Sequence, residues 1–343
     1  MLSNQIATSN IKMKTYQQLW QSLTPLYDAG EAQAIVRTVL DVKYGMTLTD
    51  IICGKVNEIS ADEERKLEEI IIRLQKGEPV QYVLGEADFA GRPFHVEPGV
   101  LIPRPETAEL CQWIEKDMIE KSIVSSGDSS EDSPEDSSGN FPQATDDARR
   151  ILDICTGSGC IAITLGLNIP NSEVTGWDIS EDALRIAQGN VEMMKAGNVR
   201  IEHQDALALP KAAETDNEKM KGNDDKEVVK PKGKAKTPST QKWDLIVSNP
   251  PYICEKEKAD MEKNVLEHEP SLALFVPDED PLKFYRAIAE YASSALKSGR
   301  ALYFEINPIY EKETREMLLK LDFKDIETKE DAFGKKRMMR AIK

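Results

Sequence analysis

Cysteine is scarce in this sequence, and the few cysteines lack the spacing of a metal site. The 343-residue chain has five, an odd number, and they are scattered without a Cys-x-x-Cys pair. They are Cys53, Cys111, Cys155, Cys160 and Cys254. Structural zinc sites and disulfide frameworks depend on closely spaced or paired cysteines. We therefore expect no bound metal and a reducing, cytoplasmic location.

Long apolar runs are also absent. The first 16 residues, MLSNQIATSNIKMKTY, are polar and lack the apolar segment of a signal peptide. No later run approaches the roughly 20 apolar residues that a membrane-spanning helix needs. The sequence predicts a protein that does not insert into a membrane.

Positive charge is in deficit. The chain carries 44 Lys and Arg against 60 Asp and Glu, which gives a formal net charge of −16. Contacts to nucleic-acid phosphates need clustered cations. This balance argues against a general surface for binding nucleic acid. It does not exclude a local basic cleft. We therefore expect no direct, specific binding of nucleic acid.

A change in the hydrophobic pattern divides the chain into two domains. Over residues 15–76, apolar residues recur three and four apart in segments that end near Gly, which is typical of helices. Ser60, followed by Glu63, predicts a capping box at the start of one helix. We predict a helical domain over residues 1–84, followed by a β-hairpin and Pro-rich linker over residues 85–109.

Residues 110–343 are predicted to form an α/β domain. Strand patterns alternate with helical patterns, which indicates a parallel sheet covered by helices on both faces. The predicted strands are Arg150–Cys155, Glu173–Asp178, Val199–Gln204, Trp243–Ser248 and Arg300–Ile306. Two polar stretches, an acidic one at 125–147 and a Lys-rich one at 211–241, interrupt this pattern. Their low apolar content predicts disordered insertions.

A glycine-containing loop joins the first strand of this domain to a helix. In LDICTGSGCIAI, Gly157 and Gly159 allow the backbone to approach a ligand, and the helix N-terminus offers free N–H groups. The spacing TGSG does not match Gly-x-Gly-x-x-Gly, which argues against a dinucleotide. Asp178 ends the next strand, where an acid often binds the hydroxyls of a ribose. Asp153, near the end of the first strand, could either set the glycine-containing loop or meet a cationic group of the ligand. Together these features favour S-adenosyl-L-methionine, with Asp153 and the glycines near its methionine end.

Each of these signals also has a purely structural explanation. A glycine loop after a strand is often no more than a tight turn, and an Asp at the end of a strand is often no more than a helix cap. Asp205 and Ala206, just after the third strand, either contact the adenine edge or form a simple turn. The order and spacing of the signals within one α/β unit favour the cofactor.

The motif SNPPY ends a buried strand, WDLIV, with a rigid polar corner. Ligands of a doubly wound sheet bind beyond the carboxyl ends of such strands. The Asn249 side-chain oxygen and the Pro250 carbonyl can each accept one N–H of a planar NH₂ group. They would point its nitrogen at a methyl group, while Tyr252 stacks on the planar group and Pro251 stiffens the corner. The motif leaves open whether the nitrogen belongs to adenine, cytosine or glutamine.

Three motifs carry a resemblance to a known family. GEPVQYVLGEADFAGRPFHVEPGVLIPRPETAEL at 77–110, ILDICTGSGCIAI at 151–163 and IVSNPPYI at 246–253 together resemble the HemK/PrmC family. These are protein-(glutamine-N5) methyltransferases that act on peptide chain release factors. The resemblance covers nearly the whole chain except the two insertions. It implies an N-terminal helical bundle that recognises the substrate, a β-hairpin and a Rossmann-like class I methyltransferase domain with a seven-stranded, mostly parallel sheet.

The resemblance also implies roles for individual residues, with the glutamine of a Gly-Gly-Gln motif as the substrate. The implied cofactor positions are Cys155, Thr156, Gly157, Ser158, Gly159, Asp178, Ala206 and Asn249. The implied substrate positions are Asn249, Pro250, Pro251 and Tyr252. Arg104 and Glu106, in the linker, either line the peptide entrance or pair with each other or with the domain interface.

The sequence departs from the family pattern at three places. Cys155 stands where the family commonly has Gly, and Ala108 replaces a frequent Glu. Asn307, in FEIN, replaces the Gly of a common Glu-Ile-Gly. None of these residues lies in SNPPY, so we expect effects on cofactor affinity rather than on the class of reaction.

Three other functions fit parts of the sequence. A glutamine methyltransferase acting on a ribosomal protein would share both motifs, and only the N-terminal domain could distinguish it. The compact helical pattern of the N-terminal domain in this chain favours the release-factor substrate. A DNA adenine-N6 methyltransferase would need a basic region to hold phosphates and flip its base. A non-catalytic binding protein would have no need of Asn249 and Pro250. We expect a monomeric enzyme.

Overall fold

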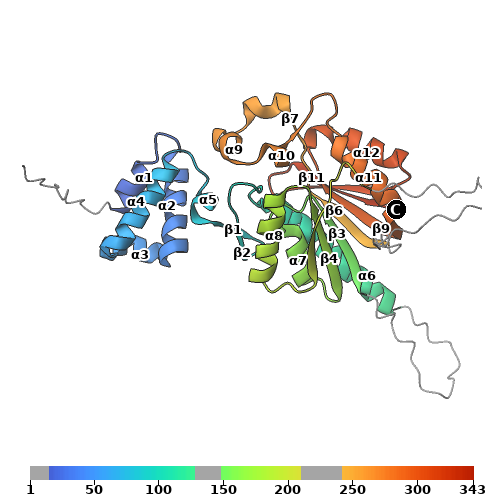
Figure 1. Ribbon diagram of the computed structural model, residues 1–343, viewed down its shortest axis with the longest axis horizontal. Helices are drawn as coiled ribbons and strands as arrows, with labels where there is room; N and C mark the ends of the chain where they lie inside the picture. Colours follow the sequence, from blue (N-terminus) through green and yellow to red (C-terminus); the bar gives the residue numbers. More distant parts are fainter. Residues whose placement is uncertain (1–14, 128–147, 210–241) are drawn as a thin grey trace, which may run out of the picture. The chain divides into compact units, whose positions relative to one another are not determined.

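The computed structural model describes residues 15–127, 148–209 and 242–343, which divide into two compact units (Figure 1). The helical unit comprises Met1–Ala87, Val96–Pro98 and Asp260–Glu269, and the sheet unit comprises Asp88–His95, Gly99–Ala259 and Pro270–Lys343. Unlike the predicted helical domain, the helical unit thus includes short segments from beyond residue 84. The predicted insertion at 211–241, and all of that at 125–147 beyond Gly127, lie outside the described residues.

The helical unit consists of amphipathic helices around one apolar core. Leu, Val and Ile side chains from several helices are buried together, as the three-and-four spacing predicts. Gly45 and Gly85 end two of the helices in the left-handed conformation that glycine adopts without strain. The helices are α1 (Tyr16–Gln21), α2 (Ala29–Tyr44), α3 (Leu48–Ile52), α4 (Ala61–Leu74), α5 (Val80–Leu84) and α9 (Lys263–His268), with a 3-10 turn, η1 (Lys55–Glu58).

Helix α4 begins with the predicted capping box. The Ser60 hydroxyl accepts a hydrogen bond from the Glu63 N–H at 3.3 Å, and the Glu63 carboxylate accepts one from the Ser60 N–H at 2.8 Å. This reciprocal pair satisfies N–H groups that have no partner within the helix. The prediction from the sequence is confirmed.

The sheet unit contains a seven-stranded sheet in the order β10-β11-β9-β6-β3-β4-β5. Neighbouring strands run parallel from β9 to β5, whereas β11 pairs antiparallel with both β9 and β10. The strands are β3 (Arg149–Ile154), β4 (Ser172–Asp178), β5 (Val199–His203), β6 (Trp243–Ser248), β9 (Leu296–Glu305), β10 (Lys324–Glu330) and β11 (Lys336–Ile342). The predicted strands are all present, although β9 begins at Leu296 because the chain leaves helix α11 (Lys283–Ala295) directly into the strand.

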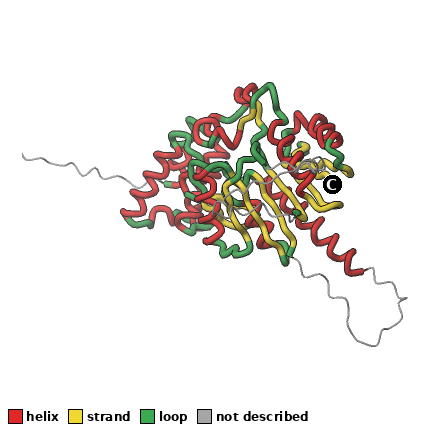
Figure 2. The backbone as a smooth tube through the Cα atoms, turned by 45° about the vertical axis from the view of Figure 1, so that its right-hand side comes forward, coloured by secondary structure: helices red, strands yellow, loops and turns green. Residues whose placement is uncertain are grey.

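Helices cover both faces of this sheet (Figures 1 and 2). Side chains of β3 alternate between the faces, so that Ile151 joins the apolar cluster under α6 and α7, and Leu152 joins the cluster under α11 and α12. The helices are α6 (Pro105–Gly127), α7 (Cys160–Asn168), α8 (Glu181–Met193), α10 (Ser271–Leu274), α11 and α12 (Glu311–Lys320), with 3-10 turns η2 (Glu255–Asp260) and η3 (Pro308–Tyr310). Helix α6 therefore includes Ser125–Gly127, the start of the predicted insertion at 125–147.

Two short sheets complete the fold. Strands β1 (Glu86–Phe89) and β2 (Arg92–His95) form the predicted hairpin, and β7 (Ile253–Cys254) pairs with β8 (Phe275–Val276). The hairpin turn falls at Ala90 and Gly91, both with positive φ. Arg92 and Pro93 belong to the second strand of the hairpin.

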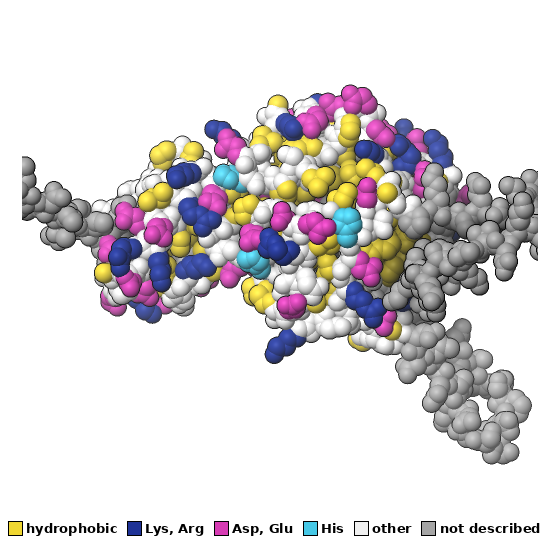
Figure 3. All heavy atoms as spheres, in the orientation of Figure 1, with side chains coloured by type: hydrophobic (Ala, Val, Ile, Leu, Met, Phe, Trp, Pro, Cys, Tyr) yellow, Lys and Arg dark blue, Asp and Glu magenta, His cyan; other side chains and the backbone are white. Residues whose placement is uncertain are grey.

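The described surface carries charges of both signs. Lys and Arg side chains are interspersed with Asp and Glu side chains on the face in Figure 3. Within the described ranges, no helix is long and apolar enough to cross a membrane. In the same ranges, no group of three or more His, Cys, Asp and Glu side chains is placed to hold a metal ion.

The Ser60→Ala variant should destabilise the start of α4. Loss of a capping side chain typically costs about 1 kcal/mol, because a helix N–H loses its acceptor. We expect faster hydrogen exchange of the amides in the first turn of α4 and a lower urea midpoint for the helical unit. Ser293→Ala, at a half-buried position inside α11, is the control. Equal effects of the two substitutions would contradict the capping role.

Candidate active site

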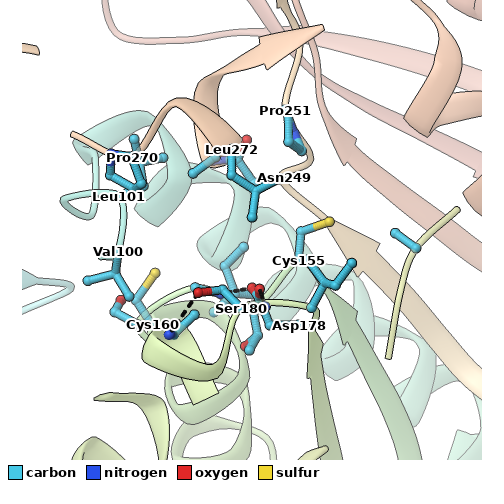
Figure 4. A pocket seen from close by; sticks show the side chains of 18 of the residues that line it. Val100, Leu101, Cys155, Cys160, Asp178, Ser180, Asn249, Pro251, Pro270 and Leu272 are labelled. Carbon is cyan, nitrogen blue, oxygen red and sulfur yellow. Dashed lines mark hydrogen bonds between the residues drawn. The ribbon is translucent and has the colours of Figure 1, made fainter. Parts of the chain in front are cut away.

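The carboxyl ends of the parallel strands surround a cavity at one edge of the sheet (Figure 4). Ligands of open α/β sheets bind at this edge. Strands β3 and β6 are adjacent and parallel, with Ile154 paired to Ser248, so the loops that follow them meet there. The predicted site residues that line the cavity are Arg104, Cys155, Thr156, Gly157, Ser158, Asp178, Asp205, Ala206, Asn249 and Pro251.

The other predicted site residues lie near the cavity without lining it. They are Glu106, Asp153, Gly159, Pro250 and Tyr252. The lining also contains apolar side chains that the sequence analysis did not single out: Val100, Leu101, Ile179, Leu207, Leu272 and Phe284. These come from distant parts of the chain, so no local pattern pointed to them.

The loop after β3 has a backbone suited to glycine. Cys155 has a φ of 63°, in the left-handed region where a Cβ costs roughly 1–2 kcal/mol. Gly157 and Gly159 have φ values of 55° and 81°. A Cβ on Gly159 would lie 3.1 Å from the Ile163 Cδ1 and 3.3 Å from the Ala187 Cβ, so close packing also favours glycine there. The departure at Cys155 therefore places a side chain where the backbone suits Gly.

Asp153 supports this loop from beneath. Its buried Oδ2 accepts hydrogen bonds from the Thr156 hydroxyl at 2.6 Å and from the Ala162 N–H at 3.2 Å. Burial raises the pKa of Asp153 to about 7, against the opposing effect of these hydrogen bonds. Of the two roles weighed from the sequence, holding the loop is the one that its contacts match.

Asp178 faces the cavity from the end of β4 (Figure 4). Its carboxylate accepts hydrogen bonds from the Gly157 N–H at 2.9 Å and from the Ser180 N–H at 3.0 Å. Burial raises the pKa of Asp178, and these backbone donors oppose the shift. A carboxylate offers about four acceptor positions. Those that the backbone leaves open can receive hydroxyl groups from a ligand.

Asp205 and Ala206 form the cavity wall after β5. The Leu207 N–H donates to the Asp205 Oδ1 at 2.7 Å, which is the hydrogen bond of a tight turn. Both residues also line the cavity, and Ala206 is buried. The turn and the predicted adenine contact are therefore compatible, and the contact stays a prediction.

The Asn-Pro-Pro-Tyr corner is held at both ends. At its start, the Ser248 hydroxyl donates to the Ile154 carbonyl at 2.6 Å, and the Asn249 Nδ2 donates to the Thr107 Oγ1 at 3.2 Å. At its end, the Tyr252 hydroxyl donates to the Glu305 Oε1 at 3.1 Å. Asn249 lines the same cavity as Asp178 and Cys155 (Figure 4).

Two residues that form hydrogen bonds with the Asn-Pro-Pro-Tyr corner were missed by sequence reasoning: Thr107, which lines the cavity, and Glu305, which does not. The Thr107 hydroxyl, at the start of α6, donates to the Glu305 Oε2 at 2.5 Å. Glu305 is only 2% exposed. Burial raises its pKa, whereas the hydrogen bonds from Thr107 and Tyr252 and the charge of Arg337 lower it. A single Glu at the end of the apolar run ALYFEI was a signal that could have identified it.

Asn307, a departure from the family pattern, ties the corner to the loop that follows it. Its Nδ2 donates to the Tyr252 carbonyl at 3.2 Å and to the Glu257 carboxylate at 3.1 Å. Its Oδ1 accepts from the Ile309 N–H at 3.0 Å and so caps η3. The turn after β9 is therefore fixed by an amide side chain that glycine could not supply.

Comparisons with known proteins match both units. A family model for the PrmC N-terminal domain matches residues 24–85, and a model for a methyltransferase domain matches residues 145–268. The release factor glutamine methyltransferase of Bacteroides thetaiotaomicron is 42% identical over 321 residues, which cover 94% of this chain and 96% of that protein. Proteins of the same name from Flavobacterium psychrophilum and Bacillus subtilis are 35% and 32% identical, and each alignment covers 96% of this chain and 98% of the relative.

Asp153 should make the stability of the ligand-free protein depend on pH. Its folded-state pKa is about 7, whereas an unfolded Asp titrates near pH ~3.9. The folded state therefore keeps a proton that the unfolded state loses between these values. The free energy of unfolding should fall as pH rises through this window, by up to about 1.4 kcal/mol per pH unit.

The Asp153→Asn variant tests this expectation. It should gain stability relative to the wild type between pH ~4 and pH ~7, since Asn has no proton to lose. Urea denaturation at several pH values measures the difference. Asp88→Asn, on the exposed side of β1, is the control and should show no such trend. A difference between Asp153→Asn and the wild type that stays constant with pH would exclude the shifted carboxyl.

Proposed function

The chain belongs to the HemK/PrmC family of release factor glutamine methyltransferases and is a methyltransferase; on that premise we propose the reaction that its site performs. The methyl group of S-adenosyl-L-methionine is transferred to the side-chain amide nitrogen, N5, of the glutamine in the Gly-Gly-Gln motif of peptide chain release factors. The observation that carries the proposal is the position of Asn249, whose carboxamide lines the same cavity as Asp178 and the glycine loop.

The cavity is chemically suited to the proposed cofactor. Asp178 has acceptor positions for ribose hydroxyls, and the backbone at Gly157 is free of a Cβ. Asp205 and Ala206 are the proposed contacts of the adenine, and the apolar side chains of Ile179 and Leu207, which line the same cavity, support a flat ring there. When bound, the cofactor supplies an electrophilic methyl group on a sulfonium.

The Asn-Pro-Pro-Tyr corner orients the nucleophile, which is the side-chain amide nitrogen of the substrate glutamine. A carboxamide nitrogen is a weak nucleophile because its lone pair is delocalised into the carbonyl. The Asn249 Oδ1 and the Pro250 carbonyl accept its two N–H groups, and the ring of Tyr252 stacks on its plane. Alignment of this kind can contribute about 7–11 kcal/mol to catalysis. The proton becomes acidic only after methyl transfer, so no base is needed beforehand.

The proposed substrate follows from the relatives. Proteins named release factor glutamine methyltransferase are similar to this chain along nearly its whole length. The match of residues 24–85 to the PrmC N-terminal domain supports a role for the helical unit in recognising the release factor. Arg104, which lines the cavity, and Glu106 are proposed contacts for the peptide at the entrance.

A methylation assay with a purified release factor tests the proposed function. We expect the wild-type enzyme to add one methyl group to the peptide that contains Gly-Gly-Gln, detected by mass spectrometry. A release factor with Ala in place of that Gln should gain none. Equal methylation of both release factors would refute the assigned target.

The Asn249→Ala variant separates chemistry from cofactor binding. We expect turnover to fall by roughly a hundredfold or more, since removal of one aligned polar group from an active site has effects of this size. The Kd for S-adenosyl-L-methionine, measured by calorimetry, should change little because Asp178 and the glycine loop remain. Full turnover in this variant would contradict the role of Asn249.

A further inference from the structure

The two ends of the Asn249 carboxamide are nearly identical in shape and opposite in hydrogen bonding. The oxygen accepts and the NH₂ group donates. Only the oxygen can accept an N–H from a substrate amide. If the carboxamide of Asn249 were flipped, its NH₂ group would face the NH₂ group of the substrate, and no hydrogen bond could form. The proposed reaction therefore requires that something other than shape select one orientation of this side chain.

Glu305 and Thr107 form a directed chain of hydrogen bonds that ends on Asn249. Both oxygens of Glu305 accept an O–H, one from Thr107 at 2.5 Å and one from Tyr252 at 3.1 Å, which is the pattern of a carboxylate. Thr107 has a single hydroxyl proton, which it donates in the hydrogen bond to Glu305. The Thr107 oxygen can then only accept, so Asn249 must turn its NH₂ group toward Thr107, at 3.2 Å.

We propose that Glu305 and Thr107 are positioning residues for methyl transfer. They fix the NH₂ group of Asn249 in a hydrogen bond to Thr107, so that the Asn249 oxygen remains available to accept from the substrate amide. This inference rests on the proposed function and extends it to residues outside the Asn-Pro-Pro-Tyr motif. The same carboxylate holds the Tyr252 hydroxyl, so one buried group sets both ends of the corner.

The surroundings of Glu305 make this arrangement rigid. The side chain is 2% exposed, and Thr107 is also 2% exposed, so water does not compete for either group. Arg337 lies 3.5 Å from the Tyr252 hydroxyl and pairs with the buried carboxylate of Asp331 at 3.1 Å. It supplies positive charge next to the chain of hydrogen bonds and supports the ionised form of Glu305.

The Thr107→Val variant tests the proposal because Val keeps the shape of Thr and removes its hydroxyl. We expect kcat for methylation of the release factor to fall roughly tenfold to a hundredfold, because the NH₂ group of Asn249 loses its acceptor, the Thr107 oxygen. The Kd for S-adenosyl-L-methionine should stay within about threefold. Thr107→Ser, which keeps the hydroxyl, should restore most of the turnover, a rescue that a merely structural role would not produce.

Thr314→Val is the matched control. Thr314, in α12, is as buried as Thr107, and its hydroxyl has no hydrogen-bond partner among the described residues. The same chemical change should leave turnover unaltered. If Thr107→Val is as active as Thr314→Val, the inference is wrong, while methylation by the wild type would leave the proposed function standing.

A second measurement decides the inference even if the release factor proves not to be the substrate. In protein labelled with ¹⁵N-asparagine, Asn249→Asp identifies the side-chain NH₂ signals of Asn249. Those signals should exchange slowly with solvent in the wild type and in Thr314→Val, and faster in Thr107→Val. Equal exchange in all three proteins would overturn the proposed hydrogen bond, whatever the outcome of the methylation assay.

Discussion

The parallel pairing of β3 with β6 is the constraint on which the site depends. With Ile154 opposite Ser248, the glycine loop and the Asn-Pro-Pro-Tyr corner leave neighbouring strands at the same edge. The Ser248 hydroxyl strengthens this junction by donating to the Ile154 carbonyl. Neither motif could serve the proposed reaction alone, because one is suited to the methyl donor and the other to the acceptor. The sheet brings them within one cavity.

Much of this architecture could be predicted from the sequence because its signals are local. Apolar runs and their spacing identified the parallel strands, and Ser60 with Glu63 identified a helix start. The position of Asn249 in the cavity also follows from local pattern, since a strand must precede the motif and ligands bind at strand ends. Such features need only a few neighbouring residues to specify them.

The remaining features depend on contacts between distant parts of the chain. Thr107 and Glu305 are 198 residues apart and meet only because α6 packs against the end of β9. The sequence suggested Asp153 either as a ligand contact or as a support, and only its burial under Thr156 distinguishes the two. Likewise, Asn307 was visible as a departure from the family pattern, but its hydrogen bonds to Tyr252 and Glu257 require the folded chain. Long-range polar pairing of this kind leaves no periodic pattern in a sequence.

The central claim is that the corner offers two lone pairs to a substrate carboxamide and aims its nitrogen at the methyl donor. It is tested most directly by a crystal structure of the enzyme with S-adenosylhomocysteine and a glutamine-containing release factor. The account predicts the glutamine NH₂ group within hydrogen-bond distance of both the Asn249 Oδ1 and the Pro250 carbonyl, with its nitrogen facing the sulfur. A glutamine bound elsewhere, or an Asn249 that presents its NH₂ group to the substrate, would contradict it.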